Sequence, residues 1–311
     1  MKARHFLSIS NLDPEDLSRL IDNSLAIARS GGAARPLDGR IVGIFFRCSS
    51  TRTRTAFSVG AMKLGAQTMH YGPNDLQIVT GESVHDTGRV LSGYLDALVL
   101  RSNGARAEME ALADQGEMAV INAMSEDEHP TQSIADLVTV KEAMGRLDDI
   151  HILYIGEGNN TTSALALAMS KLRGMQLTVV TPEGYGLPQE FVSRVSEQAR
   201  PNGTVITQTH DLGSLPKGVD VVYTTRWQTM GVPKKDANWR DRFEPYKVTP
   251  ELMSEVSKRA GTIFLHDLPA IRGWEVVDEV LDGPQSVAFR QARHKLTSAM
   301  AILSWCLPNS R

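Results

Sequence analysis

The stretch Cys48-Ser49-Ser50-Thr51-Arg52-Thr53-Arg54-Thr55 decides how the rest of this 311-residue chain is interpreted. An apolar run at 41–46 precedes it and predicts a buried strand, and the segment 53–64 after it predicts a helix. Hydroxyl and guanidinium groups therefore gather where a strand ends and a helix begins. The first N–H groups of a helix lack intrahelical partners, and the helix dipole favours an anion there. The sequence thus predicts an anion site, and the alternative is a capped helix with solvated arginines.

The composition is that of an ordinary globular protein, with 41% hydrophobic and 22% charged residues and a formal net charge of −3. This charge gives no general attraction for nucleic acid or for an anionic membrane. The two cysteines, Cys48 and Cys306, provide no disulfide framework and favour a reducing compartment. No signal-peptide pattern is evident, and no apolar run approaches the ~20 residues of a membrane helix. We therefore expect a cytoplasmic protein without nucleic-acid or membrane partners.

Strand-like and helix-like segments alternate in two series along the chain. The first series predicts strands at 41–46, 67–71, 97–100 and 118–122, and helices at 53–64, 83–94 and 105–115. The second predicts strands at 152–155, 177–180, 205–207, 219–224 and 263–265, and helices at 161–171, 188–199 and 250–259. Such alternation predicts an α/β fold in which each parallel sheet is flanked by helices and binds ligands at the carboxyl ends of its strands.

Two long helices are predicted to link the series, one running from 129 to 144 and one from 289 to 307. We therefore expect two domains with a cleft between them. The first comprises residues 1–144 and the C-terminal helix at 287–311, and the second comprises residues 145–286. A polar stretch at 227–248 is too long for a simple turn, and we expect a functional or mobile loop there.

Polar residues follow several predicted strands. Arg101 directly follows one predicted strand, His129 stands at the start of the linking helix, and Asp267 follows the last strand of the second series. Each has a structural alternative, such as a buried histidine or a capping aspartate. The glycine turn at 156–160 resembles a dinucleotide motif only weakly, because that motif requires glycine or alanine where this chain has Thr161.

Taken together, these motifs resemble the aspartate/ornithine carbamoyltransferase family. The motifs that occur in the family's order are Ser50-Thr51-Arg52-Thr53-Arg54, Arg101, His129-Pro130-Thr131-Gln132, Gly156-Glu157-Gly158-Asn159-Asn160 and His266-Asp267-Leu268-Pro269. The resemblance covers almost the whole chain and implies a carbamoyl phosphate-binding domain and an amino acid (acceptor) binding domain. It also implies a homotrimer with shared active sites, in which a neighbour's loop near 76–83 enters each site. It implies no metal and no cofactor.

The resemblance assigns the donor side of the site residue by residue. The expected catalytic residues are Arg52, Thr53, Arg101 and His129. Thr53, Arg101 and His129 would polarise the carbamoyl carbonyl as a neutral amine attacks, and the departing phosphate would take the proton. The residues expected to bind carbamoyl phosphate are Ser50, Thr51, Arg52, Thr53, Arg54, Arg101, His129, Gln132, Leu268 and Lys295.

The acceptor side departs from both branches of the family. The expected acceptor-binding residues are Asn160, Thr225, Arg226, Gln228, Thr229, Met230, His266 and Asp267. The ornithine enzymes carry aspartate at the position of Thr225 and cysteine at that of Asp267, whereas Arg226 matches an arginine with which the aspartate enzymes bind a carboxylate. Lys295 replaces an arginine of the ornithine enzymes, and Thr80 replaces a lysine of the aspartate enzymes.

Arg226 suits an acceptor carboxylate, and Asp267 suits a second, cationic amine. We therefore predict transfer of the carbamoyl group from carbamoyl phosphate to the side-chain amine of a diamino acid, with release of phosphate. The acceptor would be ornithine or a shorter homologue such as 2,3-diaminopropionate, in arginine metabolism or in natural-product assembly. The alternatives are an aspartate carbamoyltransferase, a non-catalytic anion- or amino-acid-binding protein of the same fold, and a nucleotide-dependent dehydrogenase.

Overall fold

The computed structural model describes residues 4–32, 34–228 and 233–308, which form two compact units. Unit 1 comprises residues 1–138 and 293–311, and unit 2 comprises residues 139–292. The junctions at 138/139 and 292/293 lie inside two long helices, α5 (Pro130–Met144) and α11 (Ala288–Cys306). The sequence-based junctions, 144/145 and 286/287, lie at or near the ends of those helices, because loops, unlike helix interiors, carry a recognisable boundary signal.

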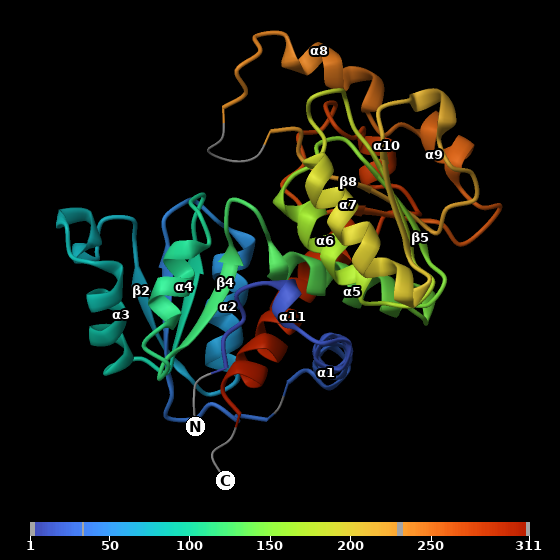
Figure 1. Ribbon diagram of the computed structural model, residues 1–311. Helices are drawn as coiled ribbons and strands as arrows, with labels where there is room; N and C mark the ends of the chain where they lie inside the picture. The colour runs from blue at the N-terminus through green and yellow to red at the C-terminus, as the bar shows by residue number, and fades with distance from the viewer. Residues whose placement is uncertain (1–3, 33, 229–232, 309–311) are drawn as a thin grey trace. The chain divides into compact units, whose positions relative to one another are not determined.

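Unit 1 is built on a four-stranded parallel sheet of order β2-β1-β3-β4 (Figure 1). The strands are β1 (Ile41–Phe46), β2 (Gln67–Tyr71), β3 (Ala97–Arg101) and β4 (Ala119–Met124). The helices are α1 (Pro14–Ser30), α2 (Arg52–Lys63), α3 (Val84–Ser92) and α4 (Ala107–Ala113), with 3-10 helices η1 (Ile9–Asn11) and η2 (Gln77–Thr80). β3 and β4 are apolar apart from Arg101 and Asn122, and all their residues are buried, as expected for parallel strands covered on both faces.

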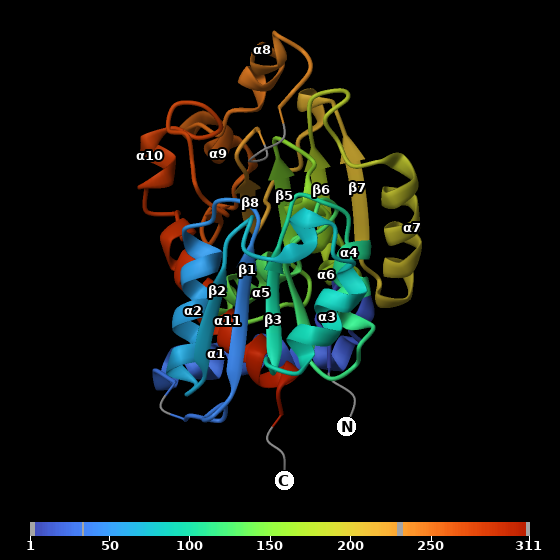
Figure 2. The same cartoon turned by 90° about the vertical axis from the view of Figure 1, so that its left-hand side faces the viewer.

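Unit 2 is built on a five-stranded parallel sheet of order β7-β6-β5-β8-β9 (Figure 2). The strands are β5 (His151–Ile155), β6 (Gln176–Val180), β7 (Val205–Thr209), β8 (Val221–Thr224) and β9 (Ile263–His266). The helices are α6 (Asn160–Ser170), α7 (Gln189–Ala199), α8 (Trp239–Phe243), α9 (Pro250–Val256) and α10 (Asp278–Leu281), with 3-10 helices η3 (Arg200–Asn202), η4 (Leu212–Ser214) and η5 (Glu244–Tyr246). The α/β fold class with two parallel sheets is therefore confirmed.

The described part of the stretch 227–248 is more ordered than a loop, because it contains α8 and η5. Trp227 and Phe243 are fully buried, and their ring centroids lie 5.5 Å apart. The expectation of a long loop was wrong here, since the polar residues of the stretch concealed the aromatic side chains that pack it. Among the described residues, no helix combines the length and the apolar character needed to cross a membrane.

Candidate active site

Three segments of unit 1 bring polar side chains to the carboxyl edge of its sheet. Arg101 is the last residue of β3, α2 follows the neighbouring strand β1, and His129 lies between β4 and α5. Nη1 of Arg101 donates to Oγ1 of Thr53 at 3.3 Å and lies 3.4 Å from Nε2 of His129. Each of these three side chains belongs to a residue only 5% exposed. The structure thus brings together three of the predicted catalytic residues.

Burial, together with the positive charges of Arg101 and Lys295, holds the pKa of His129 well below its ordinary value of 6.5. The imidazole is therefore neutral near pH 7. Because arginine can only donate, Nε2 of His129 accepts at the Arg101 contact, and the ring proton is assigned to Nδ1, which lies 3.3 Å from Oγ1 of Thr131. Without a ligand, His129 therefore accepts where Arg101 donates.

Gln132 is held at both ends of its side-chain amide. Its Oε1 accepts from the ammonium of Lys295, and its Nε2 donates to Oδ1 of Asp136 at 2.7 Å. The flanking charges fix the amide orientation, because the flipped amide would present its NH₂ to the ammonium and its oxygen to the carboxylate. Oε1 retains a second lone pair for a ligand N–H. A cavity of about 10 Å³ lies here, lined by Thr53, Ala56, Phe57, His129, Thr131, Gln132 and Lys295.

The first turn of α2 presents the remaining predicted phosphate ligands. Thr51 is the N-cap residue, and its side chain makes no capping hydrogen bond, so the first-turn N–H groups stay available to an anion. Ser50 and Arg52 are partly buried beside this turn, whereas Arg54 is exposed. Burial and the charge of Arg54 lower the pKa of His70, which places Arg54 near β2.

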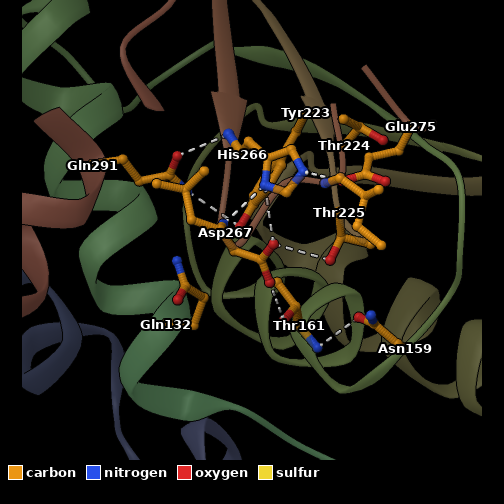
Figure 3. A network of polar contacts seen from close by, with 12 residues as sticks. Gln132, Asn159, Thr161, Tyr223, Thr224, Thr225, His266, Asp267, Glu275 and Gln291 are labelled. Atoms are coloured by element: carbon orange, nitrogen blue, oxygen red, sulfur yellow. Dashed lines mark hydrogen bonds and ion pairs between the residues drawn. The ribbon is translucent and has the colours of Figure 1, made fainter. Parts of the chain in front are cut away.

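In unit 2, the polar residues lie at the carboxyl ends of three neighbouring strands, β5, β8 and β9. Asp267 follows β9, and its carboxylate accepts from Oγ1 of Thr161 at 3.1 Å and from Oγ1 of Thr225 at 3.0 Å (Figure 3). The Asp267 side chain is 15% exposed. Asn160, buried at the start of α6, belongs to the same edge of the sheet. This edge therefore carries an oriented carboxylate that a ligand can reach.

The glycine turn before α6 serves the packing of the chain. Gly156 has φ 126°, which favours glycine. A Cβ on Gly158 would lie 2.6 Å from the backbone nitrogen of Leu187. The close approach is thus to another protein segment. Asn159 caps α6 through a capping box with Thr162.

The segment after β8 contains the other predicted acceptor residues. Arg226 and Gln228 are partly buried, and Nε of Arg226 is a buried donor that makes no hydrogen bond to the described residues. Thr229 and Met230 lie outside the described residues. Lys234, which follows them, forms a buried ion pair with Glu157 and lies 4.6 Å from the ring centroid of Tyr185.

Three further residues of the predicted site, His266, Leu268 and Lys295, are described by the structure. His266 is fully buried, so its imidazole contacts protein groups and the structure does not support direct contact with an acceptor. Leu268 adopts a left-handed backbone conformation with φ 52°, which is unusual for a residue other than glycine. Lys295, predicted to bind phosphate, contacts Gln132 in this structure.

Sequence reasoning missed several polar residues that support the site. Glu128, the last residue of the acidic run 126–128, is 1% exposed and accepts from Oγ of Ser8 and the backbone N–H of Ile9. Asp136 follows Gln132 by one helical turn, and this i,i+4 spacing is a signal that could have identified it. Nothing in the local sequence identifies Glu275, which contacts His266 across nine residues of irregular chain.

Comparison with known proteins matches both halves of the chain. The carbamoyl-P binding domain of aspartate/ornithine carbamoyltransferases matches residues 4–142, and the Asp/Orn binding domain matches residues 148–306. The latter match extends along α11, whose residues from 293 onward belong to unit 1.

Individual relatives match over nearly their full length. The ornithine carbamoyltransferase of Caldicellulosiruptor saccharolyticus is 40% identical over 303 residues, which are 96% of this chain and 97% of that protein. The ornithine carbamoyltransferase of Oceanobacillus iheyensis is 36% identical, with 98% and 94% covered. The solved structure of the ornithine carbamoyltransferase from Pyrococcus furiosus has a TM-score of 0.92 at 32% identity and covers 100% of this chain and 99% of that one.

Proposed function

Because the chain belongs to the aspartate/ornithine carbamoyltransferase family, we propose that it carbamoylates the side-chain amine of a diamino acid. Carbamoyl phosphate is the donor and phosphate is released. The observation that carries the acceptor class is the Asp267 carboxylate, which two neutral hydroxyl groups orient at the carboxyl edge of the unit 2 sheet. The relatives at 36–40% identity are ornithine carbamoyltransferases, which makes ornithine the first acceptor to test and a shorter homologue the second.

On the donor side, the phosphate of carbamoyl phosphate would bind at the first turn of α2 with Arg52. The carbonyl oxygen would face Thr53 and Arg101, whose hydrogen bonds strengthen as the oxygen becomes negative. Loss of one such donor raises the barrier by about 3–4 kcal/mol. The carbamoyl NH₂ would donate to the second lone pair of Gln132 Oε1.

The proton that the amine loses during the transfer does not require a dedicated protein base. The neutral amine forms a C–N bond to the carbamoyl carbon, and the tetrahedral adduct then breaks its C–O bond to phosphate. The departing phosphate takes the proton that the amine nitrogen loses. The protein's contribution is therefore to orient two bound substrates and to stabilise the oxyanion.

On the acceptor side, the amine that is not carbamoylated would stay protonated and pair with Asp267, while Arg226 would bind the carboxylate. A diamino acid supplies both an ammonium group and a separate nucleophile. Aspartate has a single amine, and its use as the nucleophile would leave Asp267 without a cation. This difference in charge favours a diamino acid over aspartate.

The family resemblance also supports a homotrimer with shared active sites. Exposed apolar side chains on unit 1 suit such an assembly: Met69 on the edge strand β2, Val79 in η2, Val90 in α3, and Tyr94 are each more than half exposed. The predicted shared loop contains η2.

An amine panel tests the proposal. Phosphate release from carbamoyl phosphate is measured with ornithine, lysine, 2,3-diaminopropionate, putrescine and aspartate. We expect turnover with ornithine or 2,3-diaminopropionate. Turnover with aspartate alone would overturn the diamino acid assignment, and a preference for putrescine would refute the role of Arg226. Tight carbamoyl phosphate binding without turnover of any amine would establish the non-catalytic alternative.

A further inference from the structure

A fully buried pair, His266 and Glu275, lies next to Asp267 in unit 2 (Figure 3). Nε2 of His266 lies 3.1 Å from Oε1 of Glu275. The same oxygen accepts from the backbone N–H of Ile271 at 2.6 Å. The backbone N–H of His266 donates to Oε1 of Gln291 at 2.9 Å, so the main chain is held as well as the ring.

These contacts determine where the ring of His266 carries its proton. The backbone N–H of Leu268 points at Nδ1 from 2.8 Å. A backbone amide nitrogen can only donate, so Nδ1 is an acceptor and carries no proton. The remaining nitrogen, Nε2, therefore carries the proton and donates a hydrogen bond to Oε1 of Glu275. His266 is a neutral imidazole in a single tautomer.

This tautomer decides the electrostatic state of Asp267. Oδ1 of Asp267 lies 3.6 Å from Nδ1 of His266, a distance compatible with an ion pair if Nδ1 were protonated. Since Nδ1 presents a lone pair, it does not neutralise the carboxylate. The hydrogen bonds to Asp267 come from the hydroxyl groups of Thr161 and Thr225, which are neutral. The negative charge of Asp267 thus remains available to a ligand.

We infer that Glu275 is a positioning residue for the acceptor site, acting through His266. By accepting the hydrogen bond from Nε2–H, Glu275 keeps Nδ1 unprotonated, so that Nδ1 holds the backbone N–H of Leu268 in its left-handed conformation. The negative charge of Asp267 then stays available to the acceptor ammonium. Without the Glu275 carboxylate, the ring proton can move to Nδ1, where it meets the N–H of Leu268 and displaces that residue, and where it faces Oδ1 of Asp267 in competition with the acceptor ammonium. The inference rests on the proposed function, in which Asp267 pairs with the protonated amine of the acceptor.

Two substitutions at Glu275 separate this role from simple packing. Glu275→Gln retains an oxygen for His266 and Ile271 and places its NH₂ at Oε2, a buried atom without a hydrogen-bond partner among the described residues. Glu275→Leu removes the acceptor. We expect Glu275→Leu to raise the acceptor KM at least about tenfold, the value of one charge-assisted hydrogen bond, and Glu275→Gln to stay near the wild-type KM. An equal effect of the two substitutions would overturn the inference.

The matched control is Asp220→Asn. Asp220 is a buried carboxylate of the same unit that accepts from the backbone N–H of His151 at the amino end of β5. We expect this substitution to lower stability and to leave the acceptor KM unchanged. A tenfold rise in the acceptor KM of Asp220→Asn would show that any loss of a buried carboxylate perturbs the site, and would overturn the specific role of Glu275.

A double-mutant cycle identifies the route of the effect. If Glu275 acts through Asp267, the double variant Glu275→Leu/Asp267→Asn should bind the acceptor no worse than Asp267→Asn alone. Multiplication of the two KM effects would overturn this route. An inactive wild-type enzyme in the amine panel would instead refute the proposed function, and the two failures are therefore distinguishable.

One measurement on the wild-type protein keeps the inference testable even if Glu275→Leu does not fold. Long-range ¹⁵N–¹H correlation spectra report which imidazole nitrogen is protonated, and His266→Gln identifies the signal that belongs to His266. We expect a neutral ring protonated at Nε2. A ring protonated at Nδ1, or at both nitrogens, would overturn the inference.

Discussion

At the scale of single residues, the chemistry depends on whether each donor faces the reacting oxygen. Arg52 is predicted to bind the phosphate and lies partly buried in the first turn of α2. Arg52→Ala should lower kcat/KM by about 10²–10³ with every amine, because charge stabilisation of the donor is lost whichever acceptor is bound. Steady-state phosphate release with at least two amines measures this. Turnover that is unchanged, or reduced with one amine only, would contradict the assignment.

The neutral state of His129 predicts how stability depends on pH. Its pKa in the folded protein lies well below 6.5, so below pH 6.5 the unfolded chain binds a proton that the folded chain does not. The contribution of His129 to the free energy of unfolding is therefore fully present above pH 6.5 and is lost as the pH falls toward its pKa in the folded protein. Melting temperatures at pH 7.5 and 5.5 measure the loss.

The control for this effect is His129→Asn, which should make the difference between the two melting temperatures smaller. Glu128 has the opposite sign, because burial raises its pKa and its contribution falls as pH rises above 4.5. Glu128 is present in both proteins, so its contribution cancels in the comparison. An identical pH dependence of the wild type and His129→Asn would contradict the prediction.

The residue scale also shows what sequence could and could not predict. The triad Thr53, Arg101 and His129 was predictable because each residue follows a strand of one parallel sheet. The tautomer of His129 was not, because it depends on Arg101 and Thr131 reaching opposite ring nitrogens. Likewise, burial of His266 follows from tertiary packing and not from its place beside Asp267.

At the scale of secondary structure, a series of hydrogen bonds connects helix α5 to helix α11 within unit 1 and can be tested by mutation. Asp136 is fully buried and accepts from Nε2 of Gln132, whose Oε1 accepts from Lys295. Asp136→Leu should destabilise the protein by about 1–3 kcal/mol, because it removes the carboxylate that accepts from the buried Nε2 of Gln132. Asp136→Asn, which retains an oxygen for Gln132, should cost less. Urea denaturation of both variants measures the difference, and equal costs would contradict this account.

Element prediction succeeded where turn residues or a change in polarity bound a strand. β1 matches the predicted residues 41–46, because Arg47 ends its apolar run, and β2 matches 67–71, which lies between Gly65 and Gly72. α8 was missed because Trp239 and Phe243 lie among charged residues, and the burial of Phe243 arises from packing with Tyr185 and Trp227. A helix of five residues leaves too little periodicity to detect.

At the scale of the whole molecule, sequence identified two α/β units and placed the junctions at or near helix ends, whereas the chain passes between the compact units within helices. Both passages occur within continuous helices, α5 and α11, whose residues on either side of 138 and 292 belong to different units. Such a helix shows one uninterrupted pattern, so local sequence cannot mark the change. Local sequence says even less about how several chains assemble, and a separate experiment tests the expected assembly.

If the active sites are shared between neighbouring chains, two inactive variants should complement each other. Arg101→Ala removes a donor within unit 1, and replacement of residues 77–80 by glycine and serine removes the 3-10 helix η2 from the shared loop. Each variant alone should be inactive. Co-expressed chains should regain activity, because some sites in a mixed trimer combine an intact Arg101 with an intact loop from its neighbour. Light scattering of the purified mixture would establish the trimer, and trimers without restored activity would show that each chain completes its own site.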